Sequence, residues 1–229
     1  MRAAFYQRDA GSPNLKILHG LAREAFSAVA RATILLPVQV MNATLMPVVV
    51  AAADPAYNDR HVLDVLFDDL VVGYSLGRPH GDRLITWQDF DRIGLSRRDL
   101  RRQAAGTLDY AMSSAQIHGQ PPALMLSFEG IESSALLCDD FWDSMEGSVP
   151  GSIVIGMPAR DVLVITGSRS PSGLSKVRRA VDRMFFAGGR HLLTPNLLVR
   201  RRGTWDRFRQ NRHAHPSDRG NGPHQRNHR

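Results

Sequence analysis

The chain has 229 residues, 43% of them hydrophobic, which is enough for one globular core. Its formal net charge of +7 is uneven, because nine of the 29 basic residues and two of the 22 acidic residues lie from Arg200 onward. The preceding part holds twenty of each, and this neutrality argues against a fold that reads nucleic acid with its own surface. Cys138 is the lone cysteine, so an intrachain disulfide is excluded and a reducing compartment is expected.

The N-terminal part predicts a helix followed by extended chain. Apolar residues at helical spacing indicate an amphipathic helix over residues 14–32. The opening residues lack the apolar core of a signal peptide, so we expect a cytoplasmic protein. Residues 34–53 are the most apolar stretch, but prolines and polar residues interrupt it, whereas a membrane span needs about 20 apolar residues. We therefore expect extended segments broken at Pro47 and no membrane partner.

A strand and two capped helices are predicted next. The run DLVVGYSL, residues 69–76, is typical of a strand, which we expect to begin near Val65. Thr86 and Ser96 each precede an aspartate by three residues, which resembles a capping box with Asp in place of Glu or Gln. These positions predict two helix starts, with Gly94 as the C-cap of the first helix.

The second of these helices should continue to about Gly119, because its apolar face persists and Pro121-Pro122 then stops it. Residues 123–129 predict another strand. Residues 132–146 predict one helix, in which Cys138 lies among apolar residues. A buried, structural cysteine is the favoured interpretation over a nucleophile, which would need a base and access.

The stretch GSIVIGMPARDVLVITG predicts the central β-hairpin. Ile153–Ile155 and Val162–Ile165 are β-branched runs that fit paired strands, with a loop of four to six residues between them. Arg160 and Asp161 lie in this loop. A solvated turn is the favoured interpretation, and an arginine fork presented to a carboxylate or phosphate is the alternative.

The C-terminal part predicts a long helix closed by Gly188-Gly189, a strand over residues 196–200 and a return strand after Gly203. We expect residues 1–208 to form a single α+β domain, with helices packed on a mixed or mainly antiparallel sheet around the central hairpin. Residues 209–229 are too poor in apolar groups to fold, so we expect a disordered basic tail. The tail arginines that could contact nucleic acid are Arg209, Arg212, Arg219, Arg226 and Arg229.

Several weak motifs occur together in one order: LMPVVV, DLVVGYSL, ITWQDFDRIGLSRRDLRRQA, SSALLCDDFW and GSIVIGMPARDVLVITG. In this order they resemble the bacterial YtpQ-like family, a group of uncharacterised proteins. The similarity covers residues 46–208, and the hairpin with Arg160 and Asp161, preceded by the helix with Asp140 and Trp142, is its centre. The resemblance implies an intracellular α+β domain and no particular activity.

Clustered acidic side chains on the predicted helix 132–146 could attract a hard cation. No histidine pair or second acidic motif accompanies them, so we expect no metal and no cofactor. A solvated face, or a partner for the arginines of the second capped helix, is the favoured interpretation. These arginines, Arg97, Arg98, Arg101 and Arg102, also give residues 89–105 a superficial likeness to a helix-turn-helix.

Three functions remain open from the sequence. The first is a non-catalytic module that binds a protein partner or a small ligand, with Arg160, Asp161, Asp140 and Trp142 as candidate ligand-binding residues. The second is an enzyme, a hydrolase or transferase, that uses Arg160, Asp161 and Asp140 in one cleft. The third is nucleic-acid binding, or other non-specific polyanion contact, through the basic tail.

Overall fold

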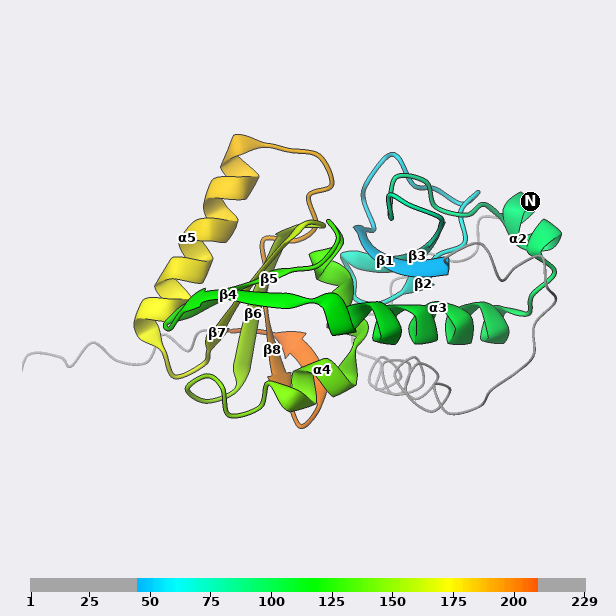
Figure 1. Ribbon diagram of the computed structural model, residues 1–229. Coiled ribbons are helices and arrows are strands. Elements are labelled where there is room, and N and C mark those ends of the chain that lie inside the picture. The colour runs from blue at the N-terminus through cyan, green and yellow to red at the C-terminus, as the bar shows by residue number, and fades with distance from the viewer. Residues whose placement is uncertain (1–44, 210–229) are drawn as a thin grey trace, which may run out of the picture.

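The computed structural model describes residues 45–209 (Figure 1). The helix predicted over residues 14–32 and the tail beyond Arg209 lie outside this range. Helices accompany two antiparallel sheets, so the predicted α+β class is confirmed. In Figure 1 the smaller sheet and α3 occupy one end of the described part of the chain, and the larger sheet with α5 occupies the other.

The smaller sheet has the order β1-β3-β2, formed by β1 (Leu45–Ala51), β3 (Leu70–Leu76) and β2 (Asp64–Val65). The expected break at Pro47 is wrong, because β1 runs through this residue opposite Tyr74. An edge strand tolerates proline, since an N–H directed away from the sheet makes no ladder bond. Val65 belongs to a separate short strand that folds back on β3, and it is not the start of β3.

Both predicted helix caps are present. In α2 (Trp87–Ile93), the Thr86 side chain accepts from the Asp89 N–H and Asp89 accepts from the Thr86 N–H, and Gly94 closes the helix at φ 70°. In α3 (Arg97–Ala111), Ser96 accepts from the Asp99 N–H. These reciprocal bonds satisfy N–H groups that a helix start otherwise leaves free.

The predicted length of α3 is wrong. The helix ends at Ala111, and a 3₁₀ turn, η1 (Met112–Ser114), leads into β4 (Gln116–Gln120). β4 pairs with β5 (Ala123–Ser127) in register across Pro121-Pro122, so the prolines belong to a hairpin turn. Every residue of β4 is exposed, which is why the sequence of this strand lacks an apolar signal.

The larger sheet has the order β4-β5-β7-β6-β8-β9, and every pairing within it is antiparallel. The predicted central hairpin is present as β6 (Ile153–Ala159) with β7 (Val162–Gly167). Its register is shifted from the predicted one, because Ile155 pairs with Ile165 but Ile153 pairs with Gly167, and Val162 pairs with Ala159. Its loop is only Arg160 and Asp161, because a bulge between Gly156 and Ala159 keeps the chain extended. The predicted C-terminal hairpin is also present, as β8 (Leu197–Arg201) with β9 (Thr204–Arg207).

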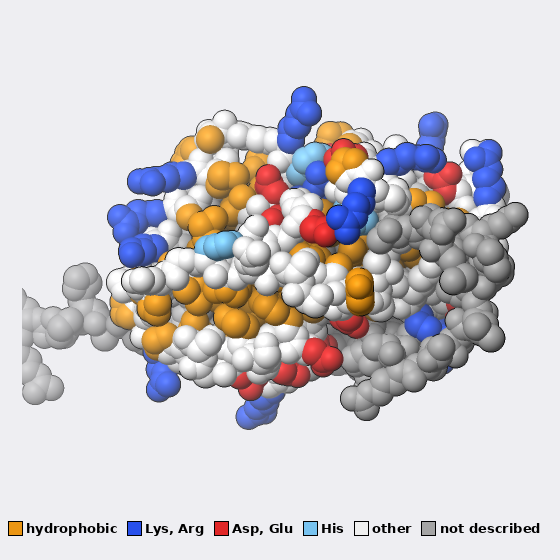
Figure 2. Space-filling view, in the orientation of Figure 1, with side chains coloured by type: hydrophobic (Ala, Val, Ile, Leu, Met, Phe, Trp, Pro, Cys, Tyr) orange, Lys and Arg blue, Asp and Glu red, His pale blue; other side chains and the backbone are white. Residues whose placement is uncertain are grey.

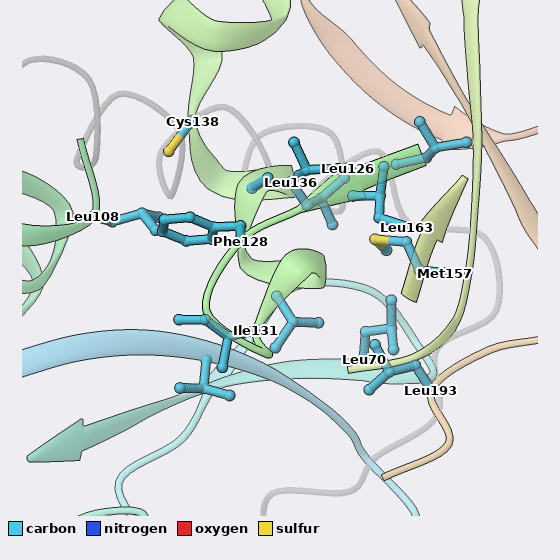
Figure 3. Packing of buried hydrophobic residues seen from close by; sticks show 14 of the residues in the cluster. Leu70, Leu108, Leu126, Phe128, Ile131, Leu136, Cys138, Met157, Leu163 and Leu193 are labelled. Atoms are coloured by element: carbon cyan, nitrogen blue, oxygen red, sulfur yellow. The ribbon is translucent and has the colours of Figure 1, made fainter. Parts of the chain in front are cut away.

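The strands β6, β7 and β8 of the larger sheet are buried on both faces, whereas β4 at its edge is exposed. The long helix α5 (Pro171–Ala187) packs on one face, where Val177 and Val181 approach Gly156 so closely that an added Cβ would lie 2.8 Å from each. The other face contributes to the main core, which also includes residues of the smaller sheet. Figure 3 shows Leu70 of β3, Met157 of β6 and Leu193 close together in this core.

The helix predicted over residues 132–146 is two shorter helices, η2 (Glu132–Leu137) and α4 (Asp139–Ser144). The chain adopts extended dihedral angles at Cys138 between them, φ −97° and ψ 90°. This break lets η2 pack against β1 and β7, while α4 lies beside β8 and β9, where Trp142 contacts Trp205. Apolar periodicity alone did not distinguish one helix from two that share a core.

Candidate functional site

Arg160 lies at the tip of the central hairpin, and the backbone on both sides fixes it. Its N–H donates to the His191 carbonyl at 3.0 Å, and its carbonyl accepts from the Ser133 N–H at 3.0 Å. The residue is 8% exposed, so the expectation of a solvated arginine in this turn is wrong. Asp161, the other turn residue, is exposed as expected.

The Arg160 side chain reaches the connection that follows β3. Its Nη1 donates to the Gly81 carbonyl at 2.5 Å, and the Tyr57 hydroxyl donates to the same oxygen at 3.4 Å. Gly81 has φ +84°, and a Cβ built on it would lie 2.7 Å from Nη1. Any larger residue at position 81 would therefore displace the guanidinium, besides straining the backbone.

The positive charge of Arg160 is poorly compensated. Its nearest described carboxylate is Asp82, with 3.5 Å between Nη2 and Oδ1, and the Asp82 side chain is 62% exposed. Within the part of the chain that the structure describes, the buried Nε has no hydrogen-bond partner. Burial of a charge without close partners is costly, so this arginine is a candidate for an external anion.

Arg200 gives an internal comparison. Its side chain is 2% exposed, yet three carboxylates surround it, those of Asp139 at 3.2 Å, Asp143 at 2.6 Å and Glu146 at 3.4 Å. Three acidic side chains of the α4 region therefore pair with an arginine from β8 and not with the arginines of α3. The exposed Asp140, Asp143 and Glu146 side chains fit the other alternative, a solvated face. The Nε of each arginine lacks a hydrogen-bond partner among the described residues. The two therefore differ in their carboxylates, of which Arg200 has three within 3.5 Å and Arg160, in the same part of the chain, has Asp82 alone.

His80 is the second buried polar group near Gly81. Neither ring nitrogen has a hydrogen-bond partner among the described residues, although Nε2 lies 3.7 Å from Glu129, which also pairs with Arg78 at 3.0 Å. Burial lowers the pKa of His80 and outweighs the opposing charge of Glu129, so the imidazole is neutral at pH 7. A neutral imidazole offers one donor and one acceptor.

Further polar atoms without partners lie on the segment that binds the Arg160 carbonyl. In the described residues, the buried Ser133 and Ser134 hydroxyls and Oε2 of Glu132 have no hydrogen-bond partner. Oε1 of Glu132 accepts from the Phe128 N–H at 2.7 Å, and burial raises the pKa of this carboxyl despite that bond. Buried polar groups are normally paired, so these atoms, on the segment whose backbone binds the Arg160 carbonyl, indicate places for bound water or a ligand.

The structure does not bring Asp140 and Trp142 to this group. Trp142 is fully buried, donates from Nε1 to the Ala135 carbonyl at 2.6 Å and packs edge-on against Trp205, so its place is structural. Asp140 is exposed on α4, near Asp109. Figure 1 shows α4 and the tip of the central hairpin at opposite ends of the sheet.

The spacing along β6 shows how far apart these two ends are. Val199 pairs with Val154, so Arg200, which α4 holds, lies beside the first residue of β6, whereas Arg160 follows its last. At about 3.3 Å per residue, the two arginines are roughly 20 Å apart. Asp140 and Arg160 therefore do not line one cleft.

Cys138 is 2% exposed and lies beside Asp109. Burial, together with the charge of Asp109, raises the pKa of its thiol far above the ordinary value. Figure 3 shows the residue at the margin of the apolar core, near Phe128 and Leu108. The expectation of a buried cysteine is confirmed, and a thiolate nucleophile is not available at neutral pH.

The arginines of α3 are partly engaged within the fold. Arg97 and Arg101 both pair with Asp64, which also accepts from the Tyr74 hydroxyl. Arg102 pairs with Asp99 at 3.5 Å, and Arg98 is exposed. This weakens the helix-turn-helix interpretation, because Arg97 and Arg101, two of the four arginines expected to contact phosphates, are paired with Asp64.

The described residues contain no group of three or more His, Cys, Asp and Glu side chains placed to hold a metal ion. Among the same residues, no helix has the length and apolar character that crossing a membrane requires. Of the tail arginines, Arg209 is exposed, and Arg212, Arg219, Arg226 and Arg229 lie outside the described residues.

The sequence-based prediction named Arg160 and Asp161 but missed Tyr57, His80, Gly81 and Glu129. The sequence signal that could have indicated these residues is the connection GRPHGD after β3, which combines glycines and a proline with charged residues and a histidine. Such loops often contain functional groups on a rigid scaffold. Nothing in the local sequence indicates that this loop meets a hairpin tip far along the chain.

Comparison with known proteins gives distant relatives. The chain is 25% identical over 153 residues to "UPF0354 protein lin1649" of Listeria innocua, across 66% of this chain and 55% of the relative. It is 24% identical over 118 residues to "UPF0354 protein Bcer98_3354" of Bacillus cytotoxicus, across 50% of this chain and 44% of the relative. The chain thus spans about half the length of the curated relatives it matches. These similarities support a relation to an uncharacterised bacterial family.

No family model matches the chain. No solved structure matches it either.

Proposed function

We propose that the protein is a non-catalytic ligand-binding module that holds a small carboxylate at Arg160. The observation that supports this proposal is the buried guanidinium, whose partners among the described residues are the Gly81 carbonyl, the Tyr57 hydroxyl and one carboxylate at 3.5 Å. Arg200, equally buried, has three carboxylates within 3.5 Å. A carboxylate ligand would supply Arg160 with the anionic partner that Arg200 already has, through the two-pronged contact that guanidinium groups favour.

The surrounding charges favour a ligand with a single negative charge. Four carboxylates, those of Asp54, Asp82, Glu129 and Asp161, lie around Arg160 or His80, and Arg78 is the other cation in this group. These carboxylates repel a dianionic phosphate about twice as strongly as a monoanion at the same place, so of the two anions the monoanion is favoured beside Arg160. His80, which like Arg160 lies next to Gly81 and Asp82, can supply a neutral hydrogen bond to the rest of the ligand.

The arrangement gives less support to the enzyme alternative, because Asp140 lies at the other end of the sheet from Arg160 and Asp161. We also propose that the protein belongs to the YtpQ-like family and works in the cytoplasm. The order of the sequence motifs supports the first statement, and the lone, buried Cys138 fits the second.

The test is thermal unfolding and calorimetric titration with acetate, succinate, citrate and inorganic phosphate. We expect a carboxylate to raise the melting temperature of the wild type, since a ligand that binds only the folded state stabilises it. Arg160→Met should abolish this shift. Arg183→Met, at an exposed position of α5, should retain it, and Figure 2 shows basic side chains spread over that helix.

Two further variants keep the test decisive. Arg160→Lys retains the charge but loses the fork, so it should fold and bind more weakly. Gly81→Ala should displace the guanidinium without removing it. Equal responses of Arg160→Met and wild type, or no response of the folded wild type to any carboxylate, would refute the proposed site.

A further inference from the structure

A polar hollow lies at the end of the larger sheet opposite to Arg160. It has a volume of about 640 Å³ and opens between the loop before β6, the turn before α5 and the β8–β9 turn. This volume is within the range of small-molecule sites. Its lining is mainly polar and includes four arginines, Arg169, Arg200, Arg201 and Arg202.

Three of these arginines have charges that the described protein does not compensate. Arg200 pairs with Asp139, Asp143 and Glu146, and Glu146 is the one acidic residue in the lining. Among described residues, no ion pair or side-chain hydrogen bond involves Arg169, Arg201 or Arg202, and all three are exposed. Arg169, Arg201 and Arg202 therefore give the exposed part of the hollow a positive charge. Arg200 lines its buried part and is held by its three carboxylates.

The backbone places Arg169 against the hollow. Gly151 has φ +84°, and a Cβ built there would lie 2.9 Å from the Arg169 Cγ and 2.6 Å from the Ser168 Oγ. The Arg169 N–H donates to the Pro150 carbonyl at 3.0 Å, and the Ser152 N–H donates to the Ser168 Oγ at 2.9 Å. The Arg169 side chain therefore packs against Gly151, where any larger residue would clash with it.

The opposite wall is the tight β8–β9 turn. Arg202 adopts φ +50° and Gly203 φ +70°, so Arg201 and Arg202 lie where the strands reverse. Arg169 lies two residues before the start of α5, whose N-terminal end adds positive potential. Arginines from two separate turns therefore meet around one volume.

We propose that this hollow binds the phosphate group of a small phosphorylated molecule. Three uncompensated arginines suit a dianion, and guanidinium groups contact phosphate oxygens through paired hydrogen bonds. The scarcity of apolar lining, limited to Val149 and Ile153, disfavours an apolar ligand. The site is independent of Arg160, from which β6 separates it.

The test is calorimetric titration of the full chain with inorganic phosphate and with a nucleoside 5′-monophosphate. Arg169→Met and Arg202→Met should each weaken binding about tenfold, because each removes one charge-assisted contact. Arg183→Met should bind as the wild type does. Backbone amide resonances of Ser152 and Ser168 should shift on titration, which locates the ligand.

Arg160→Met separates this inference from the proposed function. It should abolish the carboxylate response and leave phosphate binding unchanged, whereas Arg202→Met should weaken phosphate binding about tenfold and leave the carboxylate response unchanged. Wild-type affinity in the double variant Arg169→Met/Arg202→Met would overturn the inference. Loss of phosphate binding in Arg160→Met, with no shift at Ser152 and Ser168, would overturn it as well and assign the phosphate to Arg160.

Discussion

The carboxylate of Asp64 is expected to be the most important single charge for stability. It accepts from Nε and Nη2 of Arg101 at 2.9 and 2.6 Å and also contacts Arg97 and the Tyr74 hydroxyl. Asp64→Asn keeps the size of the side chain but leaves two arginines without a countercharge. We expect the free energy of unfolding at pH 7 to fall.

The size of this loss follows from burial. Breaking a buried ion pair by removing one partner costs about 3–5 kcal/mol. The Arg97 and Arg101 side chains are 30% and 34% exposed, so water screens them in part and the lower end, about 3 kcal/mol, applies. In a protein of this size that corresponds to a fall in melting temperature of about 6–12 °C.

The effect should also depend on pH. Burial by itself raises the pKa of Asp64, but the hydrogen bonds from Arg101 and Tyr74 and the charges of both arginines outweigh it and lower the pKa. Its stabilising contribution is therefore complete above the unfolded value of about 3.9 and is lost as pH falls through the lower folded value. The difference between wild type and variant should shrink below about pH 4.

The assay is urea unfolding from pH 7 to pH 3, with Asp91→Asn, an exposed aspartate of α2, as the matched control. The control should be within about 0.5 kcal/mol of the wild type. An Asp64→Asn protein as stable as the control at pH 7, or a difference that stays constant to pH 3, would refute this account of the ion-pair network.

Three further outcomes are expected. Val164→Asp should abolish soluble folding, because it buries an unpaired charge against α5. The control Val65→Asp, at a position 75% exposed, should remain soluble, and expression with circular dichroism measures both. Thiol labelling of Cys138 should be slow in the native protein and fast in urea; rapid labelling of the folded state would contradict its burial. Truncation after Phe208 removes five arginines and one aspartate, so polyanion binding should weaken, most clearly at low salt, while the melting temperature stays unchanged. Sequence-selective DNA binding by the truncated chain would refute a role of the tail as the polyanion-binding segment.

Local chemistry was sufficient to predict much of the fold from the sequence. Thr86 and Ser96 cap their helices as predicted, because a capping bond joins residues three positions apart. The β-branched runs of the central hairpin pair with each other, because neighbouring strands need only a short turn. Burial of Cys138 followed from its apolar neighbours along the chain.

Where contacts join distant segments, the sequence was insufficient. β4 was missed because its residues are exposed and only its ladder with β5 makes it a strand. Arg200 is the partner of the α4 carboxylates across 54 to 61 positions of sequence, and Arg160 meets Gly81 across 79. An arginine in a charged turn has the same local sequence whether water or protein surrounds it. Its burial depends on which loop packs over the turn, and the tertiary structure decides that.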